Sequence, residues 1–152
     1  MSYEVTEVDL PERPAAVVRG HVAHDGIPAF LGGAFSAVIA AVGPRGLGPA
    51  GPAFARYRVA DDGGWDIEAG FSLLAPLVGG DGEVEATTLP AGLAARTLHV
   101  GDYGMLGEAY AAVTAWLSEH DLAAAGEPWE CYLDGPEVET PRTEVFFPCR
   151  PR

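Results

Sequence analysis

A lone acidic residue stands within an aromatic segment near the end of the chain, EPWECYLDGPEVETPRTEVFFP at residues 127–148. The alternation of a strand places Trp129 and Cys131 on one side and Glu130 and Tyr132 on the other. A carboxylate that is removed from water has a raised pKa, unless a cation or hydrogen-bond donors stabilise its anion. Glu130 is therefore a candidate for binding a cation or for acting as a general base.

Aromatic side chains elsewhere in the chain are candidates to complete such a site. The candidate ligand-binding residues are Glu130, Trp129, Tyr132, Tyr57, Tyr103, Phe71 and Phe147. Their flat rings suit a planar ligand, and each cation–π contact contributes about 0.5–2 kcal/mol. The alternative is structural: Glu130 would hydrogen-bond a tyrosine hydroxyl or lie on a solvated edge of a sheet.

Other sequence motifs lack the context that their chemistry requires. Residues 46–51 satisfy GxGxxG, but they follow a predicted helix and precede a predicted strand, which is the reverse of a dinucleotide site. The histidines have no HExxH spacing, and the serines lie outside a GxSxG elbow. Cys131 and Cys149 lack the spacing of a metal or redox motif, so we expect two reduced thiols. The sequence predicts no metal and no cofactor.

The charge of the chain favours a small-molecule ligand over nucleic acid. Its 152 residues include 9 basic and 22 acidic side chains, which gives a net charge of −13. Binding to a phosphate backbone depends on clusters of Lys and Arg, whereas a negative field favours cationic small molecules. The N-terminus lacks a secretory signal, and no run approaches the roughly 18 apolar residues of a membrane span. We expect one cytoplasmic domain over residues 1–152, with no nucleic-acid or membrane partner.

Two helices and a series of strands must position the candidate residues. Apolar side chains recur at three- and four-residue spacing from Ile27 to Val42 and from Leu106 to Leu117, which predicts two helices. Strands are predicted at residues 2–9, 14–22, 53–59, 65–74, 83–89, 92–100, 128–133 and 142–148. The first two strands are expected to form a hairpin, as are the strands on either side of the DDGG turn and the last two strands.

The two halves of the chain resemble each other. PAAVVRGHVAHDG at 14–26 aligns with PAGLAARTLHVGD at 90–102, and GPAFARYRV at 51–59 aligns with GEPWECYLD at 126–134. The matched residues are Phe54 and Trp129, Ala55 and Glu130, Tyr57 and Tyr132, and Glu68 and Glu144. We therefore predict an α+β fold made of duplicated ββαββ units, residues 1–77 and 78–152, that form one antiparallel sheet with both helices on one face.

The chain resembles a known family over nearly its whole length, and the most telling motifs lie in its second half. HVGDYGMLGEAYAAVTAWL at 99–117, Trp-Glu-x-Tyr at 129–132 and Thr-Glu-x-Phe-Phe-Pro at 143–148 are similar to the gyrase-inhibitor-like (GyrI-like) effector-binding family. This family also forms the C-terminal sensor of some AraC-type and MerR-type multidrug regulators. The resemblance implies a pseudo-twofold pair of SHS2-like units, a ligand cleft between the two halves, and a buried glutamate at Glu130.

The resemblance leaves two functions of different classes open. The first is stand-alone binding of planar hydrophobic, often cationic compounds, in drug sensing or sequestration; no helix-turn-helix precedes the first strand, so sensing would require a partner protein. The second is hydrolysis, because some stand-alone relatives resemble enzymes that open cyclopropane rings in DNA-alkylating natural products. In that reaction Glu130 would be the general base, and Tyr57 or Tyr132 would hydrogen-bond the developing oxyanion. Action on a topoisomerase follows from the family name alone and ranks last.

Overall fold

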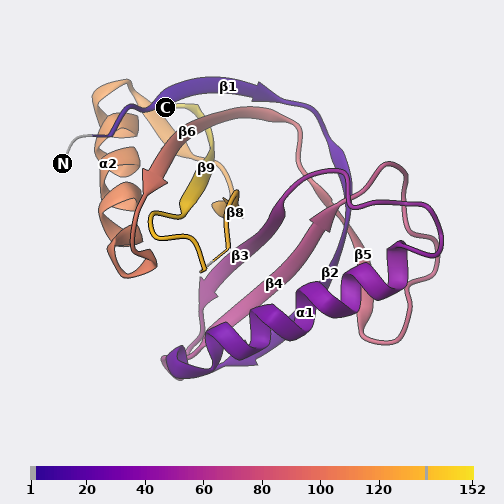
Figure 1. The fold of residues 1–152 in the computed structure, drawn as a ribbon. Coiled ribbons are helices and arrows are strands. Elements are labelled where there is room, and N and C mark those ends of the chain that lie inside the picture. Colours follow the sequence, from indigo (N-terminus) through magenta and orange to yellow (C-terminus); the bar gives the residue numbers. More distant parts are fainter. Residues whose placement is uncertain (1–2, 136) are drawn as a thin grey trace. The chain divides into compact units, whose positions relative to one another are not determined.

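The computed structural model describes residues 3–135 and 137–152, in two compact units. Unit 1 combines Met1–Pro11 with Ala91–Arg152, and unit 2 spans Glu12–Pro90. Each unit pairs antiparallel strands with one long helix, so the chain is an α+β protein, as predicted (Figure 1). The sequence also predicted that the two halves form one sheet, with both helices on one face and a ligand cleft between the halves. That arrangement stays a prediction.

Unit 2 is an antiparallel sheet covered on one face by helix α1. Its elements in chain order are β2 (Arg13–Val22), the 3-10 turn η1 (His24–Gly26), α1 (Ile27–Val42), β3 (Ala53–Val59), β4 (Trp65–Ser72) and β5 (Val84–Leu89). The strands lie in the order β3-β4-β2-β5, and α1 packs on β2 and β4. Gly20 of β2 permits this close approach, because a Cβ there would lie 2.3 Å from the ring of Phe30.

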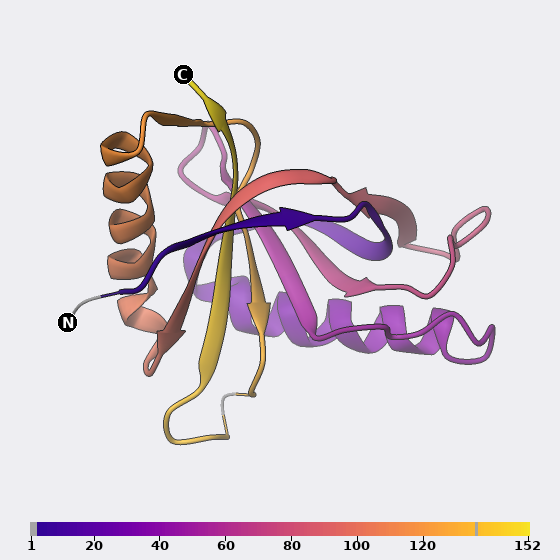
Figure 2. The same ribbon diagram turned by 90° about the horizontal axis from the view of Figure 1, so that it is seen from above.

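Unit 1 repeats this plan with strands from both ends of the chain. Its elements are β1 (Thr6–Leu10), β6 (Gly92–Val100), the 3-10 turn η2 (Tyr103–Met105), α2 (Leu106–Glu119), β7 (Leu122–Ala124), β8 (Trp129–Tyr132) and β9 (Arg142–Pro151). The strands lie in the order β1-β6-β9-β8, and β1 runs beside β6 (Figure 2). The short strand β7, which the sequence patterns missed, pairs with the end of β9.

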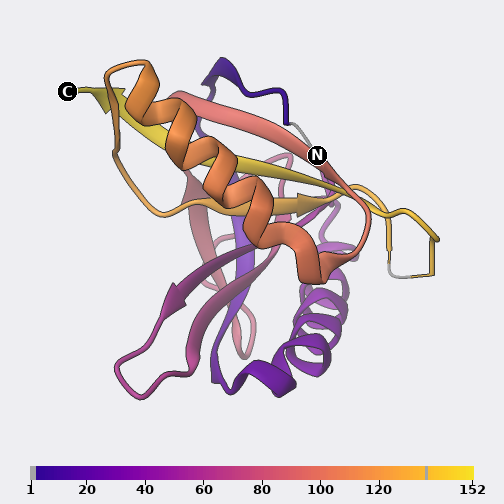
Figure 3. The same ribbon diagram turned by 90° about the vertical axis from the view of Figure 1, so that its left-hand side faces the viewer.

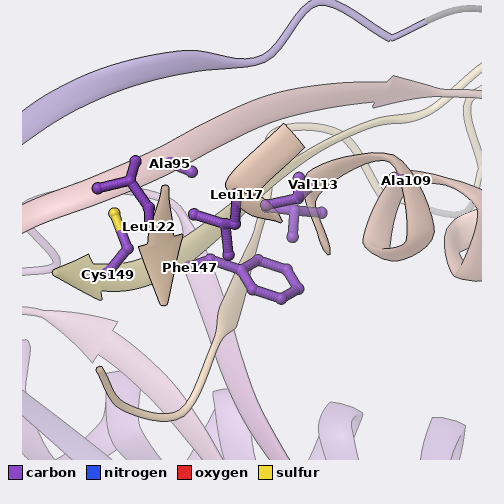
Figure 4. Close-up of a cluster of buried hydrophobic side chains, with 8 residues drawn as sticks. Ala95, Ala109, Val113, Leu117, Leu122, Phe147 and Cys149 are labelled. Atoms are coloured by element: carbon purple, nitrogen blue, oxygen red, sulfur yellow. The ribbon is translucent and has the colours of Figure 1, made fainter. Parts of the chain in front are cut away.

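Helix α2 packs on β6 and β9 to form the hydrophobic core of unit 1 (Figure 3). The buried side chains of this core are Ala95, Ala109, Val113, Leu117, Leu122, Val145, Phe147 and Cys149 (Figure 4). The helix residues belong to the apolar stripe that the sequence predicted, and the strand residues alternate with outward-facing neighbours. One face of β9 is therefore fixed against α2, and that face carries the site described below.

The expected hairpin between the first two strands is wrong. β1 pairs with β6, through Thr6 and Arg96 among others, while β2 pairs with β4 and β5. Pro11 lies in the two-residue link between β1 and β2, and its ring fixes a negative φ that the favoured two-residue hairpin turns do not accept there. The chain instead passes from one unit to the other at this point. Ser2, the first residue of the predicted strand, lies outside the described residues.

The two units have the same strand order and the same ladder registers. β2, η1, α1, β3, β4 and β5 of unit 2 correspond to β6, η2, α2, β8, β9 and β1 of unit 1. The alignment from sequence fits the last hairpins but is wrong in the strand before each helix. Ala16, which pairs with Phe71, corresponds to Ala95, which pairs with Phe147, and not to Gly92.

One helical segment has the length and composition of a membrane span. His24–Val42 is 19 residues long with a mean hydropathy of 1.6, and 22% of its most apolar 18-residue stretch is buried. The core helix of a soluble protein passes the same test, and α1 packs its buried residues on the sheet of unit 2. The feature is therefore weak evidence for a membrane location.

Candidate functional site

Unit 1 concentrates the buried polar side chains. Over residues 3–135 and 137–152, the buried polar or charged residues are Ser72, Thr97, His99, Glu130 and Thr143. All but Ser72 lie in unit 1 and share the sheet face that α2 covers. Glu130 and Thr97 both pair with Val145, and in the next row His99 and Tyr132 both pair with Thr143. These ladders bring residues from three strands into one buried polar group.

The same positions of unit 2 hold apolar or small residues. The corresponding pairs, with the unit 1 residue first, are Thr97 and Val18, His99 and Gly20, Thr143 and Ile67, and Glu130 and Ala55. The shared fold therefore accepts apolar side chains at every one of these positions. Burying a polar group is unfavourable unless partners satisfy it. The polar group is thus a feature of unit 1 that the shared fold does not require, and it makes unit 1 the place to look for a candidate site.

Glu130 is the acidic member of this group, and it is 6% exposed. Its Oε2 accepts a hydrogen bond from the Tyr110 hydroxyl at 2.5 Å, and its Oε1 accepts one from the Tyr132 hydroxyl at 2.7 Å. Burial raises the pKa of Glu130 above its ordinary value, while the two tyrosine hydrogen bonds and the nearby His99 ring oppose this shift. The effect of burial is the larger one, so the pKa stays raised. A cation bound beside Glu130 would therefore stabilise its carboxylate form.

Tyr110 is the site residue that sequence analysis missed. It lies on α2, and its ring contacts Phe147 edge-on with centroids 5.4 Å apart, which fixes the direction of its hydroxyl. Its place on the apolar stripe of the predicted helix showed that the ring faces inward. The hydrogen bond from Tyr110 to Glu130 could not be predicted from the sequence, because the distance between a helix residue and a strand residue depends on how the two elements pack.

Tyr103, one of the predicted ligand-binding residues, lies beside Tyr132 of the same group. Its ring meets the ring of Tyr132 edge-on, with centroids 6.2 Å apart, and its hydroxyl donates to the backbone carbonyl of Asp134 at 3.2 Å. Burial raises the pKa of Tyr103, and Glu137, Asp134 and Glu130 add to this effect. The charge of Glu130 thus affects the pKa of Tyr103.

His99 is tied down on both ring nitrogens. Nε2 donates to the backbone carbonyl of Asp102 at 2.8 Å, and Nδ1 lies 2.9 Å from the Tyr3 hydroxyl. A carbonyl oxygen only accepts, so Nε2 carries a proton, while the hydrogen bond between Nδ1 and the Tyr3 hydroxyl can run in either direction. These bonds fix the position of the His99 ring. Both ring nitrogens are therefore engaged, and neither is a hydrogen-bond partner of the Thr143 hydroxyl.

Thr143 is completely buried, at 0% exposure, and its hydroxyl has no hydrogen-bond partner among the residues that the structure describes. It lies in the ladder between His99 and Tyr132. A buried hydroxyl left without a partner costs about 1–3 kcal/mol. By contrast, the Thr97 hydroxyl donates to the backbone carbonyl of Glu4 at 2.8 Å, so Thr97 supports the fold and is not part of the candidate site.

Two of the predicted ligand-binding residues of unit 1 lie apart from the carboxylate. Trp129 is on the opposite face of the sheet, where it stacks on Phe146 with centroids 5.6 Å apart. Phe147 is on the same face as Glu130, but it is buried in the core and reaches the site through its contact with Tyr110. The structure thus brings together Glu130, Tyr132 and Tyr103, with Tyr110 added.

The remaining predicted residues belong to unit 2. Tyr57 and Phe71 lie on the face that α1 covers. Tyr57 contacts Trp65 edge-on with centroids 6.0 Å apart, and Phe71 contacts Phe35 in the same manner at 5.7 Å. Their role as ligand-binding residues stays a prediction.

The opposite faces of the sheets carry ion pairs. Arg19 binds Glu68 at 2.7 Å, and Arg96 binds Glu144 at 2.7 Å. The two glutamates that the repeat relates are therefore outward-facing strand residues, of a kind that contributes about 0–1 kcal/mol to stability. Burial raises the pKa of the Cys131 thiol on the same face to about 12, so it is not a thiolate nucleophile at neutral pH. Within the described ranges, no group of three or more His, Cys, Asp or Glu is arranged to hold a metal ion.

Comparisons with known proteins agree with this architecture. A model of the GyrI-like small molecule binding domain matches residues 3–150. The EcmrR–DNA complex has a TM-score of 0.81 and 19% identity over 99% of this chain, which spans 58% of that chain. The isolated EcmrR C-terminal domain matches with a TM-score of 0.73 and 20% identity over 100% of both chains. No curated protein matches the sequence.

Two further solved structures carry the same fold. A structure described as a hydrolase from Listeria innocua has a TM-score of 0.68 and 14% identity over 97% of this chain and 92% of its own. SAV2435 bound to tetraphenylphosphonium has a TM-score of 0.57 and 12% identity over 99% of this chain and 94% of its own. Because these identities are low, the structures establish the fold alone. The family match, in contrast, spans nearly the whole chain, and we conclude that the protein belongs to the GyrI-like small molecule binding domain family.

Proposed function

We propose that the protein binds planar hydrophobic cations at Glu130. The observation that carries this proposal is a buried carboxylate, 6% exposed, whose pKa is raised by burial although two tyrosine hydroxyls donate to it. The corresponding residue of unit 2 is Ala55, so the fold itself does not call for an acid. A cationic ligand supplies the missing positive charge and is favoured for that reason.

The aromatic residues support a planar and hydrophobic ligand. Tyr132 and Tyr103 border Glu130 in unit 1, and ring faces attract cations by about 0.5–2 kcal/mol per contact. Tyr57 and Phe71 of unit 2 stay proposed ligand-binding residues, on the face that α1 covers. SAV2435, a relative in fold, binds tetraphenylphosphonium, which shares the charge and the hydrophobic rings of this class of ligand but is tetrahedral and not planar. Trp129 and Phe147 act through packing, behind the residues that touch the ligand.

Binding of a fluorescent rhodamine to the wild type and to Glu130→Gln tests the proposal. The substitution keeps the shape and removes the charge, so we expect the dissociation constant to rise about 10-fold or more. Glu144→Gln is the matched control, because Glu144 is bound to Arg96 on the opposite face. Equal affinity of all three proteins, or no binding by the wild type, would overturn the proposal.

Hydrolysis of cyclopropane-bearing alkylators is the second candidate function. The raised pKa of Glu130 suits a general base, and one relative in fold is described as a hydrolase. Glu130 would take a proton from a water whose oxygen attacks the ring carbon. The electron pair of the broken ring bond would move to a conjugated oxygen, which Tyr132 or Tyr57 would stabilise by a hydrogen bond. Mass spectrometry of such an alkylator after incubation decides: a hydrated product with the wild type and none with Glu130→Gln supports catalysis.

We propose a cytoplasmic protein that does not itself bind nucleic acid or membrane. The net charge of −13 supports this, because neither phosphate backbones nor anionic lipid surfaces attract an acidic protein. EcmrR is a DNA-bound relative in fold, and this chain spans 58% of it. A role in sensing would therefore involve a partner protein or a further domain, whereas sequestration would need neither.

A further inference from the structure

Thr143 and Glu130 are neighbours on the sheet face that α2 covers. Glu130 of β8 stands opposite Val145 of β9, and Thr143 lies two positions along β9 with its side chain on the same face. Diagonal neighbours of this kind lie about 7–8 Å apart, a distance within reach of a long side chain such as that of glutamate. A ligand nitrogen bonded to both side-chain oxygens would bridge a gap of at most about 6 Å between them, since each such bond spans about 2.7–3.2 Å.

The hydroxyl of Thr143 forms no hydrogen bond to any residue that the structure describes. Its ladder neighbours bond elsewhere: His99 uses both ring nitrogens, and the Tyr132 hydroxyl donates to Glu130. The corresponding residue of unit 2 is Ile67, which shows that an apolar β-branched side chain satisfies the fold at this position. Thr143 instead carries a buried hydroxyl that has no hydrogen-bond partner among the described residues, on the same sheet face as the Glu130 carboxylate, whose pKa burial raises.

We propose that Thr143 is a second polar anchor of the ligand site, so that the site prefers cations whose amino groups carry N–H over cations whose amino groups are fully alkylated. This inference rests on the proposed function of Glu130. The Thr143 oxygen accepts one N–H of the ligand while Glu130 compensates its charge. Each Glu130 oxygen already accepts one tyrosine hydroxyl and has a second lone pair for the ligand. Fully alkylated cations use the charge of Glu130 alone.

Two acridine dyes separate these contributions. Proflavine and acridine orange share one planar cation with a protonated ring nitrogen, but proflavine bears amino groups and acridine orange bears dimethylamino groups in the same places. The two dyes therefore differ only in the N–H groups of these amino positions. We expect Thr143→Val to weaken proflavine binding about 10-fold, equal to about 1.4 kcal/mol, and acridine orange binding less than about 2-fold. Thr143→Ser keeps the hydroxyl and is expected to restore the preference for proflavine.

Thr97→Val is the matched control for burial and shape. Its hydroxyl is bonded to Glu4, and Val18 occupies its position in unit 2, so both dyes are expected to bind this variant as they bind the wild type. Urea denaturation of each variant shows that the protein measured is folded. If Thr143→Val weakens both dyes equally, or neither, the inference is overturned while the proposed function stands. If the wild type binds neither dye and no rhodamine, the proposed function fails and the inference fails with it.

Discussion

The Tyr110 hydroxyl donates to Glu130 Oε2 over 2.5 Å, which links helix α2 directly to strand β8. This bond and the one from Tyr132 act against the burial that raises the pKa of Glu130. The charge of Glu130 is therefore balanced between two opposing effects of its surroundings. Each effect can be altered by a single substitution, and the protonation of Glu130 is expected to respond in a defined direction.

Binding of a permanent cation is expected to strengthen as the pH rises through the raised pKa of Glu130. Below that pKa the carboxyl group is protonated and neutral, so the charge attraction is lost; above it the carboxylate is fully available. Tetraphenylphosphonium has no titratable group of its own, and its affinity measured from pH 4 to pH 8 reports on the protein. An affinity in Glu130→Gln that still rose with pH in the same way would assign the effect to another residue.

Removing either tyrosine hydroxyl is expected to raise the pKa of Glu130 further. The hydrogen bonds from Tyr110 and Tyr132 favour the carboxylate, so Tyr110→Phe and Tyr132→Phe each shift the pH profile of cation binding to higher pH. Tyr103→Phe is the control, because the Tyr103 hydroxyl donates to the carbonyl of Asp134 and not to Glu130. An unchanged profile in both tested variants would contradict the hydrogen-bonded arrangement.

The stability of the protein is expected to fall as the pH rises through the same range. The folded state holds the Glu130 proton at pH values where the unfolded state, with its ordinary pKa of 4.5, has already released it. The unfolded state then binds fewer protons, so the free energy of unfolding declines from pH 4.5 up to the raised pKa. Urea denaturation across this range should show that decline in the wild type, and Glu130→Gln should lack the part that Glu130 contributes.

Much of the local structure follows from the sequence, because periodicity reports which face of an element is buried. The predicted bounds Ile27–Val42 and Gly92–Val100 agree with α1 and β6, and the alternation in β8 correctly separates Glu130 from Trp129. The strand pairing was less accessible. A proline in the link after β1 turns an apparent hairpin into a crossing between units, and hydrophobic alternation alone cannot distinguish the two outcomes.

The site was only partly readable for a related reason. An acid in an aromatic strand marked Glu130, since that pattern is costly without a function. Tyr110 and Thr143 carried no such signal. A tyrosine on the apolar stripe of a helix and a threonine in a strand are ordinary residues in those elements, and only the packing of α2 on β9 brings them to the sheet face that carries Glu130.

His21 is predicted to be protonated at higher pH than an ordinary histidine. Its two ring nitrogens lie 2.8 Å from Asp66 Oδ1 and 2.8 Å from Asp62 Oδ2, and Arg58 also contacts Asp66. The hydrogen bond that His21 donates to Asp66, followed by the one that it donates to Asp62, raises the pKa of His21, while the pKa values of both aspartates are lowered. An NMR titration of His21 is expected to show the raised pKa, and Asp66→Asn is expected to reduce it.

The stabilisation from this cluster has a defined pH window. The contribution of His21 is complete below 6.5 and is lost as the pH rises through its raised pKa. The contribution of the aspartates is complete above 3.8 and is lost as the pH falls through their lowered pKa values. A His21 pKa that did not change in Asp66→Asn would show that the ring does not bond this aspartate in solution.

Gly70 and Gly33 are expected to respond to alanine in opposite directions. A Cβ at Gly70 would lie 1.8 Å from the backbone oxygen of Ala16, and a backbone atom inside a sheet cannot move aside, so Gly70→Ala should destabilise by about 1–3 kcal/mol or more. Gly33 is exposed on α1 with no described atom within 4 Å of such a Cβ, so Gly33→Ala should stabilise by about 0.5–1 kcal/mol through helix propensity. Urea midpoints of the two variants measure both effects. If Gly70→Ala were as stable as the wild type, β2 and β4 could not pack as closely as the ladder between them requires.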